Sequence, residues 1–223
     1  MRVLDIGCGG GRHVCKAAEY PGVFVVGADR DPTEVKAAQG RWADHRNLIA
    51  CGGDAGMAAA DIRALPFRDD AFDLTICSEV LEHIPDHEAA AAELARVTRR
   101  SRPLVVSVPR YLPERICWAL SNDYHANPGG HIRIYTRKRL RRLMETAGLV
   151  PWAHHWAHAL HSPYWWLICL VGKDGDGWRK GAIDLYHRFL VWDLMTRPRL
   201  ARRLEWLLNP LLGKSLVVYC RKA

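Results

Sequence analysis

Short apolar runs alternate with helix-like segments along the first half of the chain. Val3–Ile6, Phe24–Ala28 and Phe72–Ser78 are compact and mainly apolar, a pattern typical of buried strands. After each run, apolar residues recur three and four positions apart, as on the inner face of a helix. The alternation predicts an α/β fold with a parallel sheet, helices on both faces, and a ligand at the carboxyl ends of the strands.

The same pattern predicts the remaining elements. A third strand is expected to end near Asp61. In the second half of the chain, a long helical insertion should lie between two strands, the second of which ends the chain. The expected elements are a helix over Asp86–Arg100, a strand over Pro103–Val108, a helix over Thr136–Ala147, a strand from Val150 to about His158, helices within Ser162–Leu212 and a last strand over Ser215–Cys220.

The composition is that of a globular protein with one core. The chain has 223 residues, of which 49% are hydrophobic, so we expect a single domain over residues 1–223. The start of the chain shows no secretory signal pattern, which predicts a cytoplasmic protein. The longest apolar run, Tyr164–Gly172, is too short to cross a bilayer, and the seven cysteines form no C-x-x-C pair.

Charge divides the chain into two unequal halves. Residues 1–110 carry 14 Lys/Arg against 16 Asp/Glu, whereas residues 111–223 carry 18 against 8 and eight of the nine tryptophans. The two halves therefore face different demands even if they share one core.

A glycine-rich turn follows the first apolar run. Such a turn leaves backbone N–H groups free for a nucleotide-like ligand, which by itself is a weak signal. The dinucleotide fingerprint G-x-G-x-x-G is the alternative, but Gly7-Cys8-Gly9-Gly10-Gly11 fits G-x-G-x-G better.

Four ordered segments resemble the class I S-adenosylmethionine-dependent methyltransferases. Val3–Gly11 is similar to their motif I, Gly27–Asp29 to the acidic end of their second strand, Ala60–Phe67 to their third strand segment, and Phe72–Ile84 to the fourth-strand segment of the type 11 subfamily. The resemblance implies a Rossmann-like, mostly parallel seven-stranded sheet and S-adenosyl-L-methionine as cofactor. It also implies that residues 1–110 bind the cofactor and that residues 111–135 and 162–212 form acceptor-binding or lid insertions. Across the chain, with weaker motifs, the sequence also resembles bacterial members associated with methylated polysaccharide or glycolipid synthesis.

The resemblance assigns roles to individual residues. Asp29 would accept the two ribose hydroxyls, Asp61 the adenine amino group, and Ile62 would pack on the adenine ring. Asp54 is a rival for the adenine contact because Gly53-Asp54-Ala55 has a similar form. The complete expected cofactor-binding set is Asp5, Gly7, Cys8, Gly9, Gly11, Asp29, Arg30, Asp61, Ile62, Ser78 and Glu79.

The sequence departs from the family pattern in two places. It begins at the first strand without the leading helix that usually covers the cofactor, so we expect either a more open pocket or a cover from the C-terminal insertion. Arg99–Pro103 replaces the common L-x-P-G-G turn before the fifth strand.

Two histidines are candidate catalytic bases. A base is required when the acceptor must lose a proton. His83 lies just after the fourth strand, near the expected position of the methyl group, and His131 lies where related enzymes often contact the acceptor. His154, His158 and His161 would share one face of a helix and suit a metal, but the segment has the pattern of a strand, and we expect no metal site.

The aromatic, basic insertion is compatible with several acceptors. Aromatic planes suit sugar rings, and an apolar face among basic residues suits peripheral contact with lipid. The expected function is O-methylation of a glycan, glycolipid or other small molecule. The alternatives are C-methylation of a lipid or quinone, methylation of nucleic acid, for which no catalytic motif is present, and a regulatory module without turnover. The sequence predicts no oligomeric state.

Overall fold

The computed structural model describes residues 1–49, 52–121, 130–172, 177–196 and 198–223. The chain divides into two compact units. The first unit comprises Met1–Ser107, Lys138–Ala153 and Val218–Ala223, and the second comprises Val108–Arg137 and His154–Val217. Part of the predicted 111–135 insertion, residues 122–129, lies outside the described residues.

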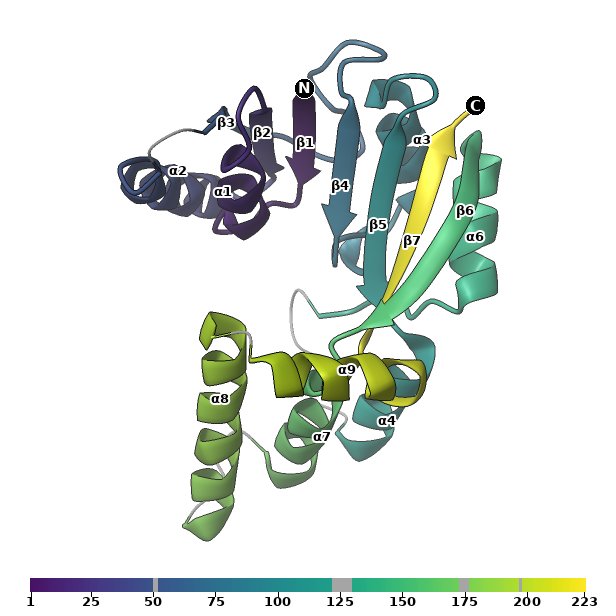
Figure 1. The fold of residues 1–223 in the computed structure, drawn as a ribbon. Coiled ribbons are helices and arrows are strands. Elements are labelled where there is room, and N and C mark those ends of the chain that lie inside the picture. Colours follow the sequence, from purple (N-terminus) through teal and green to yellow (C-terminus); the bar gives the residue numbers. More distant parts are fainter. Residues whose placement is uncertain (50–51, 122–129, 173–176, 197) are drawn as a thin grey trace. The chain divides into compact units, whose positions relative to one another are not determined.

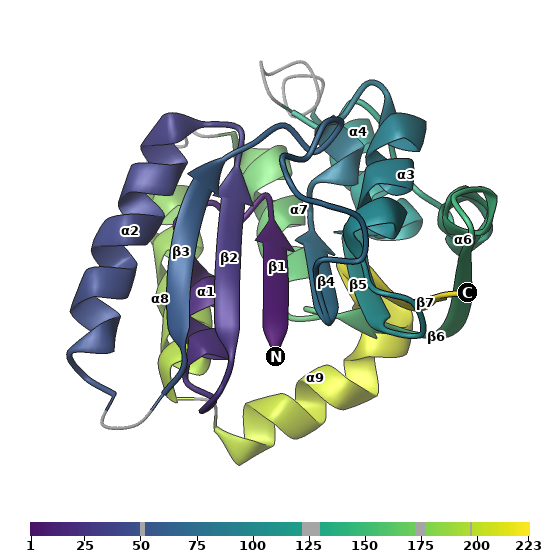
Figure 2. The same cartoon turned by 90° about the horizontal axis from the view of Figure 1, so that it is seen from above.

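The strands form one sheet in the order β3-β2-β1-β4-β5-β7-β6, which can be followed across Figure 2. Neighbouring strands from β3 to β5 are parallel, and Figure 1 shows β7 running opposite to them. The prediction of a mostly parallel seven-stranded sheet is therefore confirmed. The strands are β1 (Arg2–Ile6), β2 (Phe24–Asp29), β3 (Asp54–Ala59), β4 (Leu74–Ser78), β5 (Pro103–Pro109), β6 (Leu149–Ala157) and β7 (Ser215–Lys222).

Helices flank the sheet of the first unit. Helix α1 lies on one face, α2 packs against α1 and β3, and α3 and α6 lie on the opposite face (Figure 1). Asp31 begins α2 by accepting a hydrogen bond from the Thr33 N–H, and Pro32 occupies the first helical position, where its missing N–H costs nothing. The helices are α1 (Arg12–Ala18), α2 (Pro32–Arg46), the 3-10 turn η1 (Leu81–His83), α3 (His87–Val97) and α6 (Arg137–Thr146).

The core of the first unit is built from the apolar runs that predict the strands. Val3 and Val25 are fully buried and pack with Val14 of α1 and Trp42 of α2. Four strands with buried centres fix the register, because a shift by one residue would turn each apolar side chain to the other face. The carboxyl ends of β1, β2 and β4 are thereby held side by side.

The second unit is mainly helical. Within its described residues the helices are α4 (Tyr111–Leu120), α7 (His161–Val171), α8 (Trp178–Thr196) and α9 (Arg199–Leu212). Three of them occupy the predicted helical segment 162–212, whereas α4 was not predicted. Pro113 and the aromatic composition of this stretch obscure the helical pattern, although proline is tolerated in a first helical turn. Among the described helices, none has the length and apolar composition required to cross a bilayer.

Candidate cofactor and catalytic site

The glycine turn after β1 adopts a conformation that requires glycine. Gly7, Gly9 and Gly11 all have positive φ angles, of 70°, 46° and 77°. A Cβ at Gly7 would also lie 2.2 Å from Cγ2 of Val80. The N–H groups of Gly7 and Cys8 donate to the Ala28 carbonyl at 2.7 and 3.1 Å, so the turn is anchored to the end of β2.

Asp29, the last residue of β2, organises the turn from the opposite side. Its Oδ2 accepts a hydrogen bond from the Gly9 N–H at 3.0 Å, and its Oδ1 accepts one from the Asp31 N–H at 3.0 Å. Each carboxylate oxygen can accept a further hydrogen bond, so both remain able to receive hydroxyl groups. Asp29 is therefore held in a fixed orientation at the carboxyl end of β2.

Asp61 follows β3 at the same edge of the sheet. Its carboxylate accepts the Arg63 backbone N–H at 2.9 Å and the Arg63 guanidinium at 2.6 Å. These hydrogen bonds hold the pKa of Asp61 at about 2, so the side chain is an acceptor at physiological pH. The rival Asp54 begins β3, paired with Phe24 at the amino end of β2, away from the carboxyl ends where Asp29 lies.

A hydroxyl network supports the end of β4. Ser78 and Ser107 lie 2.8 Å apart through their Oγ atoms, and Ser107 Oγ donates to Glu79 Oε1 at 3.0 Å. The Glu79 backbone has a φ of 55°, an uncommon conformation for a residue with a side chain. This network fixes the direction of the Glu79 carboxylate.

These elements enclose a pocket of about 220 Å³ in the first unit. Seven predicted site residues line it: Gly7, Asp29, Arg30, Asp61, Ile62, Glu79 and His83. Ile6, Ala60, Val80 and Ile84 also line it and were not predicted, although their places beside the motif residues make them detectable. Asp5, Cys8, Gly9, Gly11 and Ser78 do not line the pocket, and several of them support the lining residues.

Cys8 and Asp5 lie behind the glycine turn. Burial, together with Asp5 and Asp29, raises the pKa of Cys8 to about 12, so its thiol stays protonated and is a packing group. Asp5 is 1% exposed; its Oδ1 lies 3.6 Å from His13 Nδ1, and its Oδ2 has no hydrogen-bond partner among the described residues. A buried carboxylate oxygen without a partner favours a cationic or hydrogen-bonding ligand group nearby.

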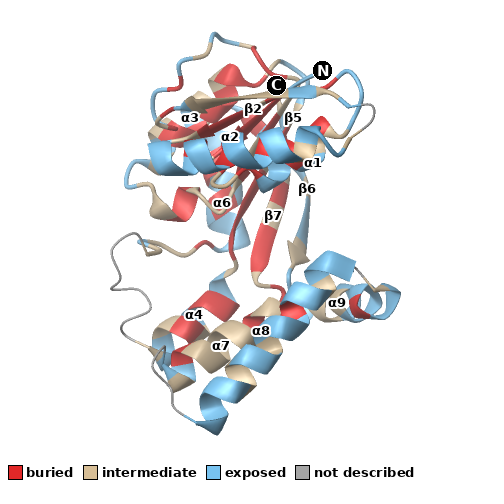
Figure 3. Ribbon diagram, turned by 90° about the vertical axis from the view of Figure 1, so that its left-hand side faces the viewer, coloured by how far each residue is buried: buried red, intermediate tan, exposed pale blue. Residues whose placement is uncertain are grey.

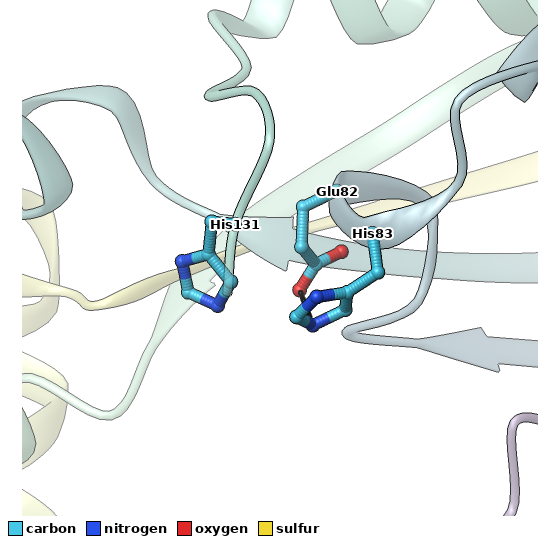
Figure 4. Close-up of side chains that lie close together, drawn as sticks. All are labelled: Glu82, His83 and His131. Atoms are coloured by element: carbon cyan, nitrogen blue, oxygen red, sulfur yellow. Dashed lines mark ion pairs between the residues drawn. The ribbon is translucent and has the colours of Figure 1, made fainter. Parts of the chain in front are cut away.

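His83 lies in η1, directly after β4, and lines the pocket. Its Nε2 is 3.9 Å from Oε1 of Glu82, whose side chain is fully buried (Figure 4). A buried carboxylate at this distance from the ring restrains the orientation of the imidazole. Glu82 was not among the predicted site residues, although its place next to His83 in the fourth-strand motif was visible.

His131, the third residue labelled in Figure 4, belongs to the second unit. Its Nδ1 pairs with Oε1 of Glu114, which is 1% exposed and also accepts the Trp118 indole N–H at 3.3 Å. Sequence analysis missed Glu114 because it missed α4, on which Glu114 and Trp118 are one helical turn apart.

The strand predicted after Gly148 is confirmed, and it separates the remaining histidines. His154 and His155 lie in β6, whereas His158 follows the strand and His161 begins α7. In the second unit, ligand atoms of His158, His161 and Glu205 lie within 4.8 Å of one another. Glu205 accepts a hydrogen bond from the His158 backbone N–H, so its carboxylate stabilises the turn before α7.

His161 makes the stability of the protein pH-dependent. Burial, followed by His158 and Lys214, lowers its pKa from 6.5 to about 4. Between these values the unfolded chain binds more protons, so stability present above pH 6.5 is lost as the pH falls toward 4. We expect wild type to lose about 1–2 kcal/mol more than His161→Gln between pH 7 and pH 5, measured by urea unfolding.

His13 is the control for this experiment, because its contribution to stability should change with pH in the opposite direction. A hydrogen bond with Asp5 raises the pKa of His13, so His13 contributes stability below pH 6.5 that is lost as the pH rises through its folded pKa. His13→Gln should therefore cost more stability at pH 5 than at pH 7. Equal pH dependence of wild type and His161→Gln would contradict the assignment to His161.

Comparison with known proteins identifies the family of the chain. A family profile described as a methyltransferase domain matches residues 1–154. The chain belongs to this methyltransferase family. Norajmaline N-methyltransferase of Rauvolfia serpentina is 35% identical over 104 residues, which are 47% of this chain and 34% of that enzyme. The matches with the first curated methyltransferases thus span only about a third to two fifths of their lengths.

Solved methyltransferases share the fold. A SAM-dependent methyltransferase from Methanosarcina mazei aligns with a TM-score of 0.63 at 16% identity, covering 99% of this chain and 92% of that one. Geranyl diphosphate methyltransferase in complex with SAM aligns with a TM-score of 0.63 at 14% identity, covering 100% and 78%. The chain is thus a class I methyltransferase in fold, and S-adenosylmethionine is the cofactor of its family.

The pocket residues fit this cofactor. The glycine turn approaches Val80 so closely that only a residue without a Cβ fits at Gly7, and the Asp5 Oδ2 atom lacks a partner. Asp29, Asp61 and Ile62 line one pocket and offer two acceptors and an apolar surface. This donor and acceptor set suits a ribose, an adenine and an amino acid group together.

Proposed function

We propose that this chain is an S-adenosylmethionine-dependent methyltransferase that methylates a hydroxyl oxygen of a glycan, glycolipid or other small molecule. The observation that carries the proposal is the pocket in which Asp29, Asp61 and Glu79 converge from three strand ends, with His83 on its lining. The resemblance to type 11 enzymes and to polysaccharide- or glycolipid-associated members supports the same acceptor class.

Each pocket residue has a distinct role in this proposal. Asp29 binds the ribose hydroxyls, Asp61 the adenine amino group, and Ile62 packs on the adenine ring. Glu79 and Gly7 contact the methionine part of the cofactor, and Asp5 and the rest of the glycine turn shape that end of the pocket. These contacts hold the methyl donor in place, which supplies much of the rate when the donor is already activated.

The bound cofactor supplies a sulfonium methyl group that is activated for displacement. His83 accepts the proton that the acceptor hydroxyl loses as its oxygen takes the methyl group, and the buried Glu82 stabilises the resulting imidazolium. His131, oriented by Glu114, remains a predicted acceptor contact.

Small acceptors are supported by two relatives. Their names give norajmaline and geranyl diphosphate as substrates, and both are small molecules. C-methylation of a lipid or quinone is the alternative, since the exposed apolar residues of the second unit also suit a prenyl chain. The buried free thiols of six cysteines suit a reducing compartment such as the cytoplasm.

Isothermal titration tests the cofactor assignment. We expect micromolar binding of S-adenosylmethionine and S-adenosylhomocysteine and no binding of NAD. Incubation with radiolabelled methyl donor should then label one of three acceptor pools: polar glycans, lipid extract or RNA. Within the lipid pool, a label on a hydroxyl oxygen of a glycolipid would support the proposal, whereas a label on a carbon of a lipid or quinone would favour the alternative function. Binding of NAD alone would overturn the proposal.

A further inference from the structure

Helix α9, coloured mostly as exposed in Figure 3, presents a row of exposed leucines. Leu200, Leu204, Leu207 and Leu211 recur three and four residues apart, so they lie along one face of the helix. Their exposed fractions are 79%, 44%, 63% and 69%. Single exposed leucines are common, but a complete row over three helical turns is the pattern of a face that binds a partner. We call these four residues the leucine row.

A neighbouring face of α9, about 100° round the helix from the leucine row, holds the helix in the second unit. Ala201 is buried with Leu160 and Leu190, and Leu208 packs against the same cluster. At the C-terminal end, Asn209 Oδ1 accepts the Ala159 N–H at 3.0 Å, and the Leu212 carbonyl accepts the Ser162 hydroxyl at 2.6 Å. The leucine row is therefore not needed to attach α9, and polar residues should be tolerated there.

Arginines border the leucine row. Arg203 stands three residues after Leu200 and four before Leu207, so it neighbours both on the helix surface. Arg199 continues this border one turn earlier, and Trp206, 75% exposed, continues it one turn later. The helix carries three arginines and one glutamate, and the glutamate is half-buried.

We propose that the leucine row of α9 docks this protein on membranes containing anionic lipids. A helix with an apolar face, a cationic border and an interfacial tryptophan lies in the plane of a bilayer surface, with its apolar side chains below the headgroups. Arginine side chains at the border reach anionic headgroups while their stems stay among apolar groups. The proposal does not depend on the acceptor or on turnover.

Charge argues against a second copy as the occupant. A symmetric contact between two leucine rows would bring the arginines of both copies together, with a single half-buried glutamate per helix to offset them. An anionic lipid surface complements the same arginines. The leucine row and its arginine border therefore complement an anionic membrane surface better than they complement the same surface of a second copy.

Co-sedimentation with vesicles tests the proposal. We expect the protein to bind vesicles of phosphatidylcholine with phosphatidylglycerol, and to bind phosphatidylcholine alone at least about tenfold more weakly. The variant Leu200→Gln/Leu207→Gln/Leu211→Gln should lose binding by at least about tenfold. Arg199→Gln/Arg203→Gln should reduce the preference for anionic vesicles and leave binding less sensitive to salt.

Matched controls separate docking from folding. Leu48→Gln removes a leucine of the first unit that is 81% exposed, and it should bind vesicles like wild type. All variants should keep the circular dichroism and S-adenosylmethionine affinity of wild type. Equal vesicle binding by wild type and the triple variant would overturn the proposal. A second result would also overturn it: wild type does not bind vesicles but forms a dimer by light scattering, and the triple variant is a monomer.

Discussion

Asp29→Ala is expected to weaken S-adenosylmethionine binding by roughly 30- to 150-fold. The substitution removes two charge-assisted hydrogen bonds to the ribose, worth about 2–3 kcal/mol together. It also removes the acceptors of the Gly9 and Asp31 N–H groups, which loosens the glycine turn. Isothermal titration of variant and wild type measures the change.

Asp54→Ala is the matched control. Asp54 is an exposed carboxylate on the neighbouring strand, but it lies at the amino end of β3 and does not line the pocket. Its substitution should leave the affinity unchanged. If Asp54→Ala weakens binding and Asp29→Ala does not, both the ribose assignment and the position of the pocket are wrong.

His83→Gln is expected to slow methyl transfer by about 10²- to 10⁴-fold, the usual contribution of a positioned base. Glutamine keeps a polar side chain of similar reach but cannot accept a proton at neutral pH. Affinity for S-adenosylmethionine should change little, because His83 contacts the acceptor in the proposed mechanism. The readout is transfer of radiolabelled methyl groups to the pool that wild type labels.

His87→Gln serves as the control, since His87 begins α3 and does not line the cofactor pocket. It should transfer methyl groups at the wild-type rate. Full activity of His83→Gln would show that the acceptor needs no base from this position, as expected for an atom that is nucleophilic without losing a proton.

The residues that line the pocket beside Asp29 and Asp61 were largely predictable because they lie in short contiguous segments of the sequence. Gly7 follows β1 directly and Asp29 ends β2, and the parallel arrangement of these buried strands brings their carboxyl ends together without knowledge of longer contacts. Asp61 was placed near the end of the third strand, and the structure ends β3 two residues earlier, at Ala59. Boundaries of this kind shift with local hydrogen bonding.

Residues that act through distant partners were not predictable. Glu114 pairs with a histidine 17 residues away, across a segment whose helical part the pattern did not reveal. Ser107 supports Glu79 from 28 residues away, through a strand whose apolar pattern gives no sign of a hydroxyl contact. Such pairs depend on tertiary packing, which a single sequence does not encode in its periodicity.

The position of β7 in the sheet has a consequence for protein synthesis. Strand β7 lies between β5 and β6, yet the ribosome makes it after α9, some sixty residues later than β6. Until β7 emerges, β6 has no neighbour in the nascent sheet and β5 has an open edge. An open strand edge invites pairing with other chains, so the growing polypeptide is most prone to aggregate during this interval. Translation speed through the codons for α7 to α9 therefore sets how long that edge stays open.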